Sequence, residues 1–351
     1  MKFLITGGAG FIGSALIRHL INNTNHLILN LDKMTYASNE KSLESVKGSK
    51  NYKFELCDIC DFEHVKSVIL DYKPDLIVHF AAESHVDRSI DSPKDFINTN
   101  IFGTFNLLEA SLEYLRELKE INIKNFLFYH ISTDEVFGDL EPSDPPFCES
   151  NSYKPNSPYS ASKASSDHLV RSWGKTYGLP YVISNCSNNY GPFQNTEKFI
   201  PQIIIKALNG EQIPIYGAGD QVRDWLYVDD HVRAIEKVAI KGNRYNTYNI
   251  GGNSEKTNLQ VANFVCELLD KLVQNKPNGI NKFCELISFV DDRPGHDLRY
   301  AINATKINKE LGWAPNESFE TGIEKTVTWY IENYEMFSKK QLIRLGLGDK
   351  K

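Results

Sequence analysis

Residues 4–13 have the sequence L-I-T-G-G-A-G-F-I-G, a short apolar run followed by closely spaced glycines. Gly8, Gly10 and Gly13 satisfy the G-x-G-x-x-G spacing, and Gly7, Gly10 and Gly13 satisfy the more open G-x-x-G-x-x-G spacing. Glycines let the backbone turn sharply from a strand into a helix and approach a pyrophosphate closely. The motif is weak alone, but here it joins a predicted strand to a predicted helix. It therefore predicts a strand–helix–strand unit that binds a dinucleotide.

The chain that follows alternates between strand and helix patterns as far as residue 186. Strands are predicted at 2–6, 26–32, 54–58, 75–82, 125–133 and 179–185, and helices at 11–22, 64–71, 100–119 and 160–177. Continuous apolar runs indicate strands that are buried on both faces, and their alternation with helices predicts a parallel sheet. We therefore expect an α/β fold, with a Rossmann-type, doubly wound, NAD-binding domain over residues 1–186.

The pattern changes beyond residue 186, where Pro, Gly and Asn become frequent. Short helices are predicted at 201–209, 259–272 and 319–334. This composition predicts a smaller, mixed α/β domain over residues 187–351, above the carboxyl ends of the strands. One more strand, near 245–251, is expected to return to the first sheet.

Composition limits the classes of protein that need to be considered. A chain of 351 residues with 41% hydrophobic and 24% charged residues is long enough for two domains with sizeable cores. The net charge of −6 gives no electrostatic reason to expect nucleic acid as a partner. No apolar run reaches the roughly 18 residues of a membrane-spanning helix, and the first residues lack the features of a signal peptide. The expectation is a cytoplasmic protein without a nucleic-acid or membrane partner.

The six cysteines include one C-x-x-C pair, Cys57 and Cys60. A zinc site would need a second pair of ligands at a suitable spacing, and the sequence has none. His79 and His85 also lack neighbours with ligand spacing. We expect reduced thiols and no metal site.

Asp32 ends the second predicted strand, 19 residues after Gly13. A carboxylate at this place accepts hydrogen bonds from the ribose hydroxyls and repels a 2′-phosphate, which favours NAD over NADP. Lys33 is a counter-argument, because a lysine could attract that phosphate. Asp58 is either an adenine-binding residue or a solvated turn residue. The other cofactor-binding candidates near these strands are Phe11, Ile12, Thr35, Ile59, Ala81, Ala82 and Thr99.

Tyr159 and Lys163 form a Y-x-x-x-K motif at the start of a predicted helix. About one such pair is expected by chance in a chain of this composition. The motif is therefore informative only because it lies at the start of the helix that follows the fifth predicted strand. One helical turn places both side chains on the same face. To act as a base near pH 7, the pKa of the tyrosine must fall by about 3 units, and a lysine ammonium and a cationic nicotinamide nearby have the right charge for this. The pair predicts hydride chemistry on a nicotinamide cofactor.

The glycine motif together with Tyr159 and Lys163 resembles the extended short-chain dehydrogenase/reductase family, whose members mostly act on nucleotide sugars. In that family a Ser or Thr after the fifth strand assists the tyrosine, and Thr133 holds this place. The family's 4-epimerases commonly continue with a small or polar pair, whereas this chain has Asp134 and Glu135. Without the resemblance, these two carboxylates could equally cap the next turn.

Further segments, in order and with sensible spacing, are similar to those of the dTDP-glucose 4,6-dehydratases within this family. They are A-A-E-S-H-V-D-R-S (81–89), T-D-E-V-F-G (133–138), N-C-S-N-N-Y-G-P-F (185–193), K-F-I-P (198–201) and D-D-R-P-G-H-D (291–297). The resemblance covers nearly the whole chain.

The resemblance implies an NAD-dependent lyase that removes water from a sugar. Tyr159 takes the proton of the sugar 4-hydroxyl, with Thr133 sharing that hydrogen bond, while carbon 4 is oxidised. Glu135 then removes the proton on carbon 5 as general base, and Asp134 protonates the departing 6-hydroxyl as general acid. Hydride returns to carbon 6, so the product is a 4-keto-6-deoxy sugar nucleotide for deoxysugar synthesis, most commonly that of rhamnose.

A nucleotide-diphosphate sugar needs cations for its pyrophosphate and flat groups for its base. Arg223 and Arg293 are the expected phosphate binders, and the resemblance gives Asn189 a cofactor contact. It also implies substrate contacts for Ser84, Thr133, Asn188, Lys198, Phe199, Pro214, Tyr216, Asn258 and His296.

Three alternatives remain open at this point: a UDP-glucose 4,6-dehydratase, a nucleotide-sugar 4-epimerase, and a catalytically inactive NAD-binding scaffold. The quaternary structure is expected to be a homodimer. The predicted helices at 100–119 and 160–177 have more apolar positions than one sheet face can cover, and the family pairs these helices between subunits.

Overall fold

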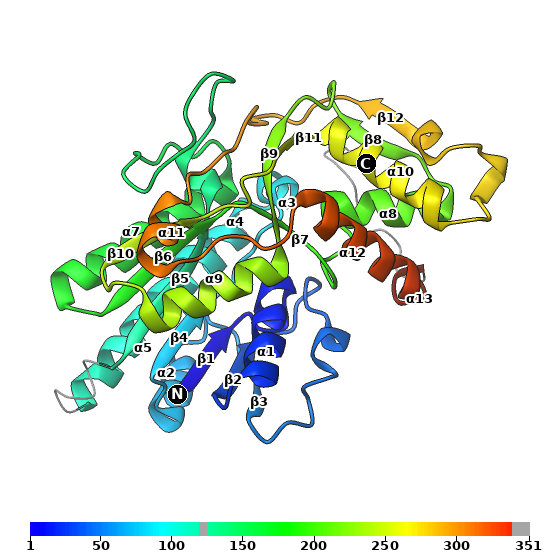
Figure 1. The fold of residues 1–351 in the computed structure, drawn as a ribbon. Coiled ribbons are helices and arrows are strands. Elements are labelled where there is room, and N and C mark those ends of the chain that lie inside the picture. The colour runs from blue at the N-terminus through cyan, green and yellow to red at the C-terminus, as the bar shows by residue number, and fades with distance from the viewer. Residues whose placement is uncertain (119–124, 339–351) are drawn as a thin grey trace.

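A computed structural model describes residues 1–118 and 125–338. Seven parallel strands form its central sheet (Figure 1). Their order across the sheet is β10 (Asn246–Ile250), β6 (Tyr181–Cys186), β5 (Leu127–Thr133), β4 (Leu76–His79), β1 (Lys2–Thr6), β2 (Leu27–Asp32) and β3 (Tyr52–Leu56). The predicted α/β architecture is confirmed, and β10 is the strand that was expected to return to this sheet.

Helices cover both faces of this sheet, because successive strand residues point to opposite sides. On β1, Phe3 and Ile5 join one buried cluster, whereas Leu4 joins another. The first cluster packs beneath α1 (Phe11–Asn23) and α9 (Val228–Lys241), and the second beneath the helices of the other face. Those helices are α2 (Phe62–Tyr72), α5 (Thr104–Glu117) and α7 (Pro158–Tyr177).

The direction of strand succession changes between β1 and β4. From β1 the chain proceeds outward to β2 and β3, and from β4 it proceeds outward on the other side to β5 and β6. A change of this kind opens a crevice at the carboxyl ends of the two central strands, where α/β proteins bind ligands. The glycine-rich turn after β1 lies at this point.

The later elements gather at the end of the sheet toward which the strands point (Figure 1). They include two small sheets, β11 (Glu255–Thr257), β9 (Val222–Tyr227) and β7 (Asn188–Tyr190), and β12 (Ile287–Val290) with β8 (Ile213–Tyr216). Their helices are α8 (Phe199–Asn209), α10 (Asn258–Leu272), α12 (Phe319–Glu332) and α13 (Glu335–Ser338), around a core of their own. By contrast α9, β10 and α11 (Thr305–Leu311) contribute to the core below the first sheet. The division at residue 186 therefore stays a prediction.

Several elements differ from those predicted. The predicted helix 100–119 begins as a π-helical segment, η2 (Ile97–Gly103), before α5, and Lys119 lies outside the described residues. The strand β3 is not buried on both faces, because it forms the edge of the sheet and exposes Phe54 and Leu56. The sequence patterns did not predict α3 (Val86–Asp91), α4 (Pro93–Phe96), α9 or the strands of the two small sheets.

Over residues 1–118 and 125–338, no helix is long and apolar enough to cross a membrane. Within the same ranges, no group of three or more His, Cys, Asp or Glu side chains could hold a metal ion. Cys57 and Cys60 are free thiols.

Candidate active site

A cavity of about 300 Å³ lies where the central strands end. All the predicted cofactor-binding residues except Asp58 line it: Gly7, Gly10, Phe11, Ile12, Gly13, Asp32, Lys33, Thr35, Ile59, Ala81, Ala82, Thr99, Tyr159, Lys163 and Asn189. Asp58 lies outside this lining, with its Oδ2 atom 3.5 Å from Lys33 Nζ. Since Lys33 has this carboxylate partner, its charge is a weaker attraction for a 2′-phosphate.

The glycine turn faces the cavity with backbone atoms that no side chain covers. Gly7 has φ +70°, and a Cβ atom there would lie 2.6 Å from the backbone nitrogen of Ala81. A Cβ atom on Gly13 would lie 2.5 Å from the carbonyl oxygen of Gly7. Such distances exclude any side chain, so both positions need glycine. The turn leads directly into α1, as a pyrophosphate-binding turn does.

Asp32 ends β2 and helps to shape the adjoining loop. Its Oδ2 atom accepts a hydrogen bond from the backbone of Ala9 at 2.9 Å, and its Oδ1 atom accepts one from Met34 N at 2.8 Å. The carboxylate thus fastens the glycine turn to the loop after β2. The bare turn, this carboxylate and the small side chains of Ala81 and Ala82 fit an NAD molecule.

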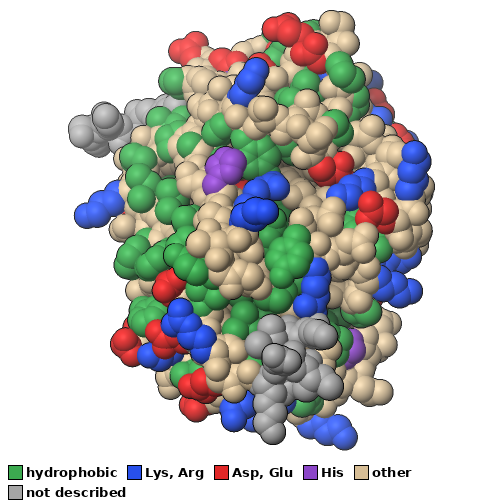
Figure 2. Space-filling model, turned by 90° about the vertical axis from the view of Figure 1, so that its left-hand side faces the viewer, with side chains coloured by type: hydrophobic (Ala, Val, Ile, Leu, Met, Phe, Trp, Pro, Cys, Tyr) green, Lys and Arg blue, Asp and Glu red, His purple; other side chains and the backbone are tan. Residues whose placement is uncertain are grey.

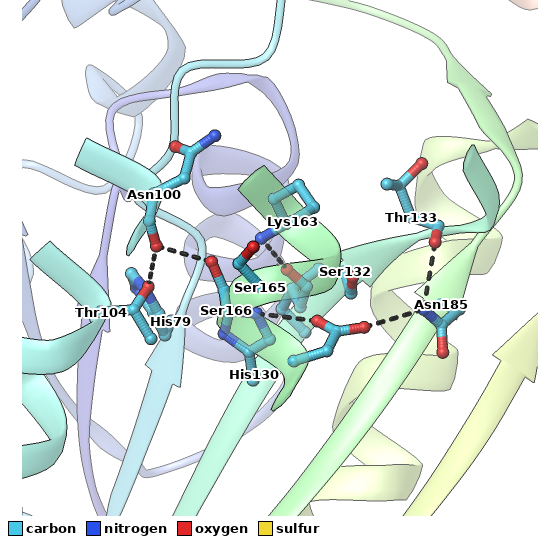
Figure 3. Close-up of polar contacts among 12 residues, drawn as sticks. His79, Asn100, Thr104, His130, Ser132, Thr133, Lys163, Ser165, Ser166 and Asn185 are labelled. Atoms are coloured by element: carbon cyan, nitrogen blue, oxygen red, sulfur yellow. Dashed lines mark hydrogen bonds and ion pairs between the residues drawn. The ribbon is translucent and has the colours of Figure 1, made fainter. Parts of the chain in front are cut away.

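The five predicted catalytic residues lie together along the same cavity. Thr133 is the last residue of β5, and it caps the short 3-10 segment that carries Asp134 and Glu135. Tyr159 is the second residue of α7, whose start is fixed by Pro158 and by a capping box between Ser157 and Ser160. Lys163 follows one turn later, and its Nζ atom donates to the carbonyl oxygen of Ile131 at 2.8 Å (Figure 3).

Asp134 and Glu135 have different electrostatic surroundings. Burial, Glu135 and Asp224 raise the pKa of Asp134 well above its usual value. Burial also raises the pKa of Glu135, but the positive charges of Arg293, Arg223 and Lys198 oppose that rise. The arrangement therefore favours a neutral Asp134 beside an ionised Glu135, as an acid–base pair requires.

The expected lowering of the tyrosine pKa does not occur in the protein alone. Burial, followed by the charges of Glu135 and nearby groups, raises the pKa of Tyr159 well above its usual value, and only a hydrogen bond with Thr133 opposes this. Burial also lowers the pKa of Lys163 to about 8. The adjacent carboxylates and the cost of burying a charged phenolate both raise the pKa of Tyr159, and neither can be read from the Y-x-x-x-K motif.

A second cavity, of about 470 Å³, adjoins the first. Glu135, Asn188, Asn189 and Lys198 line both cavities, so Glu135 lies where they meet, whereas the adjacent Asp134 lines the first cavity only. Thr133 lines the first cavity only. The other predicted substrate-binding residues all line the second: Ser84, Asn188, Lys198, Phe199, Pro214, Tyr216, Arg223, Asn258, Arg293 and His296.

The two arginines of the second cavity are held differently. Arg223 lies 4.3 Å above the ring of Tyr300 and donates to three backbone carbonyl groups, which fixes its guanidinium in place. Arg293 pairs with Asp87 at 2.8 Å, and its buried Nε atom has no hydrogen-bond partner among the described residues. Arg293 therefore has a donor available for an anionic ligand.

Sequence reasoning missed several residues that line the second cavity, among them His85, Asp87, Glu197 and Tyr300. Asp87 also accepts a hydrogen bond from Tyr216 at 3.1 Å, so it positions two predicted ligand-binding side chains. His85 and Asp87 belong to the recognised segment 81–89, and Glu197 directly precedes Lys198. The positions of His85, Asp87 and Glu197 within or beside recognised segments could have identified them, whereas Tyr300 lies in no motif.

Comparisons with known proteins agree with this geometry. Residues 4–326 match the family model described as GDP-mannose 4,6 dehydratase. A dTDP-glucose 4,6-dehydratase of Escherichia coli is 55% identical over 347 residues, which cover 97% of this chain and 96% of that protein. One from Neisseria meningitidis is 53% identical over 352 residues, with 99% of each chain covered.

Solved structures give the same result. A dTDP-glucose 4,6-dehydratase of Streptomyces venezuelae with NAD bound is 40% identical, with a TM-score of 0.86 and coverage of 96% of this chain and 98% of that one. A UDP-glucose 4-epimerase of Thermotoga maritima is 28% identical, with a TM-score of 0.82 and coverage of 95% and 100%. The resemblance to the 4,6-dehydratases is confirmed, and the chain belongs to the GDP-mannose 4,6 dehydratase family.

Proposed function

We propose that this protein is a dTDP-glucose 4,6-dehydratase, an NAD-dependent lyase that yields dTDP-4-keto-6-deoxy-glucose. The observation that carries the proposal is the position of Asp134 and Glu135, with Glu135 at the junction of a dinucleotide cavity and a second, arginine-lined cavity. A 4-epimerase needs no such acid–base pair for elimination. The high identity to dehydratases that act on dTDP-glucose supports the same substrate here.

The first cavity would hold the cofactor. The glycine turn receives the pyrophosphate, Asp32 the adenosine ribose, and Lys163 the nicotinamide ribose. NAD, when bound, supplies the hydride acceptor for carbon 4 and the hydride donor for carbon 6. Its positive nicotinamide would add a second charge, beside that of Lys163, that favours ionised Tyr159.

The chain's own residues move the protons. Tyr159 accepts the proton of the sugar 4-hydroxyl at its phenolic oxygen, and the Thr133 hydroxyl orients that oxygen. The resulting 4-ketone acidifies the proton on carbon 5, which the carboxylate of Glu135 removes. The neutral carboxyl of Asp134 then donates its proton to the 6-hydroxyl, which leaves as water, and Glu135 returns its proton to carbon 5 once carbon 6 has gained the hydride.

The second cavity would hold the nucleotide part of the substrate. Arg293 offers its free Nε donor to the diphosphate, and Arg223 presents a guanidinium already fixed by the backbone. Asn188 and Lys198, which line both cavities, are positioned to contact the sugar between them.

The function is tested by incubating the NAD-loaded protein with dTDP-glucose or UDP-glucose, with nuclear magnetic resonance of the products. We expect dTDP-4-keto-6-deoxy-glucose without net NADH, and a much lower rate with UDP-glucose. Preferred turnover of UDP-glucose would identify the UDP-glucose dehydratase alternative. A galactose product that keeps its 6-hydroxyl would identify a 4-epimerase, and NAD binding without turnover an inactive scaffold.

The biological setting is also a proposal. The keto-deoxy product is a precursor for reductases or epimerases of deoxysugar synthesis, such as that of rhamnose. We place the protein in the cytoplasm, as a homodimer.

A further inference from the structure

A buried carboxylate lies one helical turn beyond Lys163. Asp167 on α7 has no exposed surface, yet it touches polar groups from three other segments. Tyr153 donates its hydroxyl to Asp167 Oδ2 at 2.8 Å, and Asn185 Nδ2 lies 3.4 Å from the same oxygen. His130 Nε2 lies 3.2 Å from Asp167 Oδ1 (Figure 3). None of these side chains lines either cavity, so no ligand role explains them.

The same network reaches the reacting residues. Asn185 on β6 also donates to the backbone oxygen of Thr133 at 3.0 Å, which fixes the end of β5 (Figure 3). Lys163 donates to Ile131 on the same strand. Asp167 is thus joined through Asn185 to the strand that carries the Thr133 hydroxyl, and through α7 to the lysine.

Asp167 is ionised in this setting. Burial alone would raise its pKa, but His130, Lys163 and Ser132 lower the pKa on balance. Burial and Lys163 lower the pKa of His130 to about 4, so the imidazole is neutral and does not cancel the carboxylate charge. Arg171 reaches the carboxylate only through the Tyr153 hydroxyl, to which it donates at 2.7 Å.

Asp167 lies one helical turn from Lys163 on α7, and its charge raises the pKa of that lysine against the lowering caused by burial. The titratable groups that face the ammonium are Asp167 on its own helix, His130 on β5, His79 on β4 and Cys186 on β6. Both histidines have lowered pKa values, and burial raises the pKa of the Cys186 thiol to about 12. All three are therefore neutral near pH 7, which leaves Asp167 as the charged member of this set.

We propose that Asp167 is a positioning residue, whose carboxylate keeps Lys163 in its ammonium form and, through Asn185, fixes the strand end that presents Thr133. The inference rests on the proposed function, because it concerns the reaction that Lys163 serves. It adds no step to the chemistry: Asp167 touches neither cavity and acts only through its neighbours.

The direct test is titration of Lys163 itself, by nuclear magnetic resonance of protein labelled with ¹³C-lysine. Its signal is the one that disappears in Lys163→Arg, and in the unchanged protein we expect it to titrate near 8. Asp167→Asn keeps the size of the side chain but removes its charge. We expect the Lys163 titration to move to lower pH by about 1–3 units, the range for loss of a nearby opposite charge.

A second readout is the pH profile of turnover at saturating sugar nucleotide. Because Lys163 acts as a cation, turnover falls as pH rises through its pKa. In Asp167→Asn that fall should begin at lower pH, with KM nearly unchanged. Asp167→Glu should restore the original profile. Tyr153→Phe removes a hydrogen bond from the network but keeps the charge, so its profile should not move. Asp75→Asn, at the opposite end of the sheet, is the control for a general loss of stability.

An unmoved Lys163 titration in Asp167→Asn would overturn the proposal, as would an equal shift in Tyr153→Phe. Asp167→Ser provides the same measurement if the Asn variant does not fold. The titration needs no substrate, so a protein that proves inactive on dTDP-glucose refutes the proposed function while the role of Asp167 is still measured.

Discussion

Asp134 and Glu135 are adjacent in the chain, yet the structure gives them unequal surroundings. Asp134 is 2% exposed, and its Oδ2 atom has no hydrogen-bond partner among the described residues. Glu135 instead lies near three cations, and it borders both cavities. The Oδ1 atom of Asp134 accepts one hydrogen bond, from the Thr133 hydroxyl at 3.2 Å. A buried carboxyl with so few partners is more stable when neutral, whereas a carboxyl near cations is more stable when ionised. The acid and the base of an elimination are thereby distinguished by environment.

Replacing this pair should separate oxidation from elimination. In Asp134→Asn and Glu135→Gln, Tyr159 and Lys163 remain, so the sugar should still reduce bound NAD. Water loss should slow by about 10²–10⁴-fold, the usual contribution of a general acid or base. Absorbance at 340 nm in a single turnover measures the first step, and product analysis measures the second. Asp95→Asn and Glu63→Gln, both at exposed positions, are the matched controls. Elimination at the normal rate in both site variants would refute the assigned roles.

Arg293 should control the acidic side of the pH profile. Glu135 acts in its ionised form, so turnover falls as pH decreases through its pKa, which burial raises above 4.5. The Arg293 charge opposes that rise. In Arg293→Gln the fall should therefore occur at higher pH, by about 1 unit. The measurement is kcat against pH at saturating substrate, with Arg116→Gln at an exposed position as the control. A fall that moves to lower pH would contradict this electrostatic role.

Site residues that belong to a local sequence motif were predicted. Site residues that are brought to the cavity only by the tertiary fold were missed. Thr133 to Glu135 follow directly from the end of one strand, and Tyr159 and Lys163 from the start of one helix. Tyr300 reaches the second cavity because Arg223 stacks on it, a contact between positions 77 residues apart. The raised pKa of Tyr159 was missed for the same reason, since burial is a property of the folded chain.

At the scale of elements, the buried strands of the central sheet were predicted, whereas the strands of the two small sheets were not. The apolar runs placed β1 at its observed bounds, because a strand buried on both faces has an unambiguous composition. The π-helical segment η2 was not predictable, since its apolar residues also suit a regular helix. There Asn100 bonds to the backbone of Glu83 and to Ser162 on α7, which joins two walls of the first cavity. Segments of this type frequently occur at functional sites.

The loop after β2, helix α3 and the segment before α8 meet beside the first cavity in a contact that we call the strap and define by Tyr36, Arg88 and Glu197. The Arg88 guanidinium lies 3.8 Å from the centre of the Tyr36 ring, and its Nε atom lies 3.2 Å from Glu197 Oε2. Asn195 adds a bond from its side chain to the backbone oxygen of Tyr36 at 3.4 Å. The neighbours Thr35 and Ala37, and also Glu197, line the cofactor cavity. The strap thus connects the loop after β2 to the substrate side.

Loss of the strap should speed release of NAD. Tyr36→Ala removes the cation–π contact, which contributes about 0.5–1 kcal/mol at exposed sites, so dissociation should accelerate by about 2–5-fold. Tyr36→Phe keeps the ring over Arg88 and loses only an exposed hydrogen bond to Glu83, so it should release NAD more slowly than Tyr36→Ala. Stopped-flow displacement of bound NAD by an excess of a fluorescent analogue measures both. An equal rate in the wild type and Tyr36→Ala would show that the strap does not retain the cofactor.

At the scale of the whole molecule, the active site depends on segments that are far apart in the chain. The acidic pair comes from the end of β5, the arginines from β9 and a loop near residue 293, and the cofactor turn from residues 7–13. The sequence predicted each of these parts.

The sequence patterns did not predict α9, whose buried residues complete the core beneath β1. Val228, Val232, Ile235 and Val238 recur at helical spacing, so the sequence did offer a signal for this helix, although it lies among Gly- and Asn-rich loops.

The outer side of α5 and α7 leaves an apolar surface, which we propose is the dimer interface. Hydrophobic side chains gather on this side of the molecule (Figure 2). Phe102, Phe105, Trp173 and Tyr177 form a continuous row, with successive ring centres 5.9, 5.8 and 5.5 Å apart. Phe102 and Tyr177 are 51% and 56% exposed, which is unusual for side chains of this size. A second copy of the chain, with the same helices, would cover this row by a two-fold contact.

Charge placed in this row should dissociate the dimer. In Phe102→Asp the interface would have to bury an unpaired carboxylate, and it would lose apolar contact worth about 1.5–3 kcal/mol for each copy of the side chain. We expect the dissociation constant to rise by about 10²-fold or more, while the unfolding temperature of the protomer changes little because Phe102 is half exposed already. Phe289→Asp is the matched control, since Phe289 is 58% exposed on β12 and lies outside the row. Sedimentation velocity at micromolar concentration distinguishes the outcomes: a monomeric wild type refutes the dimer, and a dimeric Phe102→Asp places its interface elsewhere.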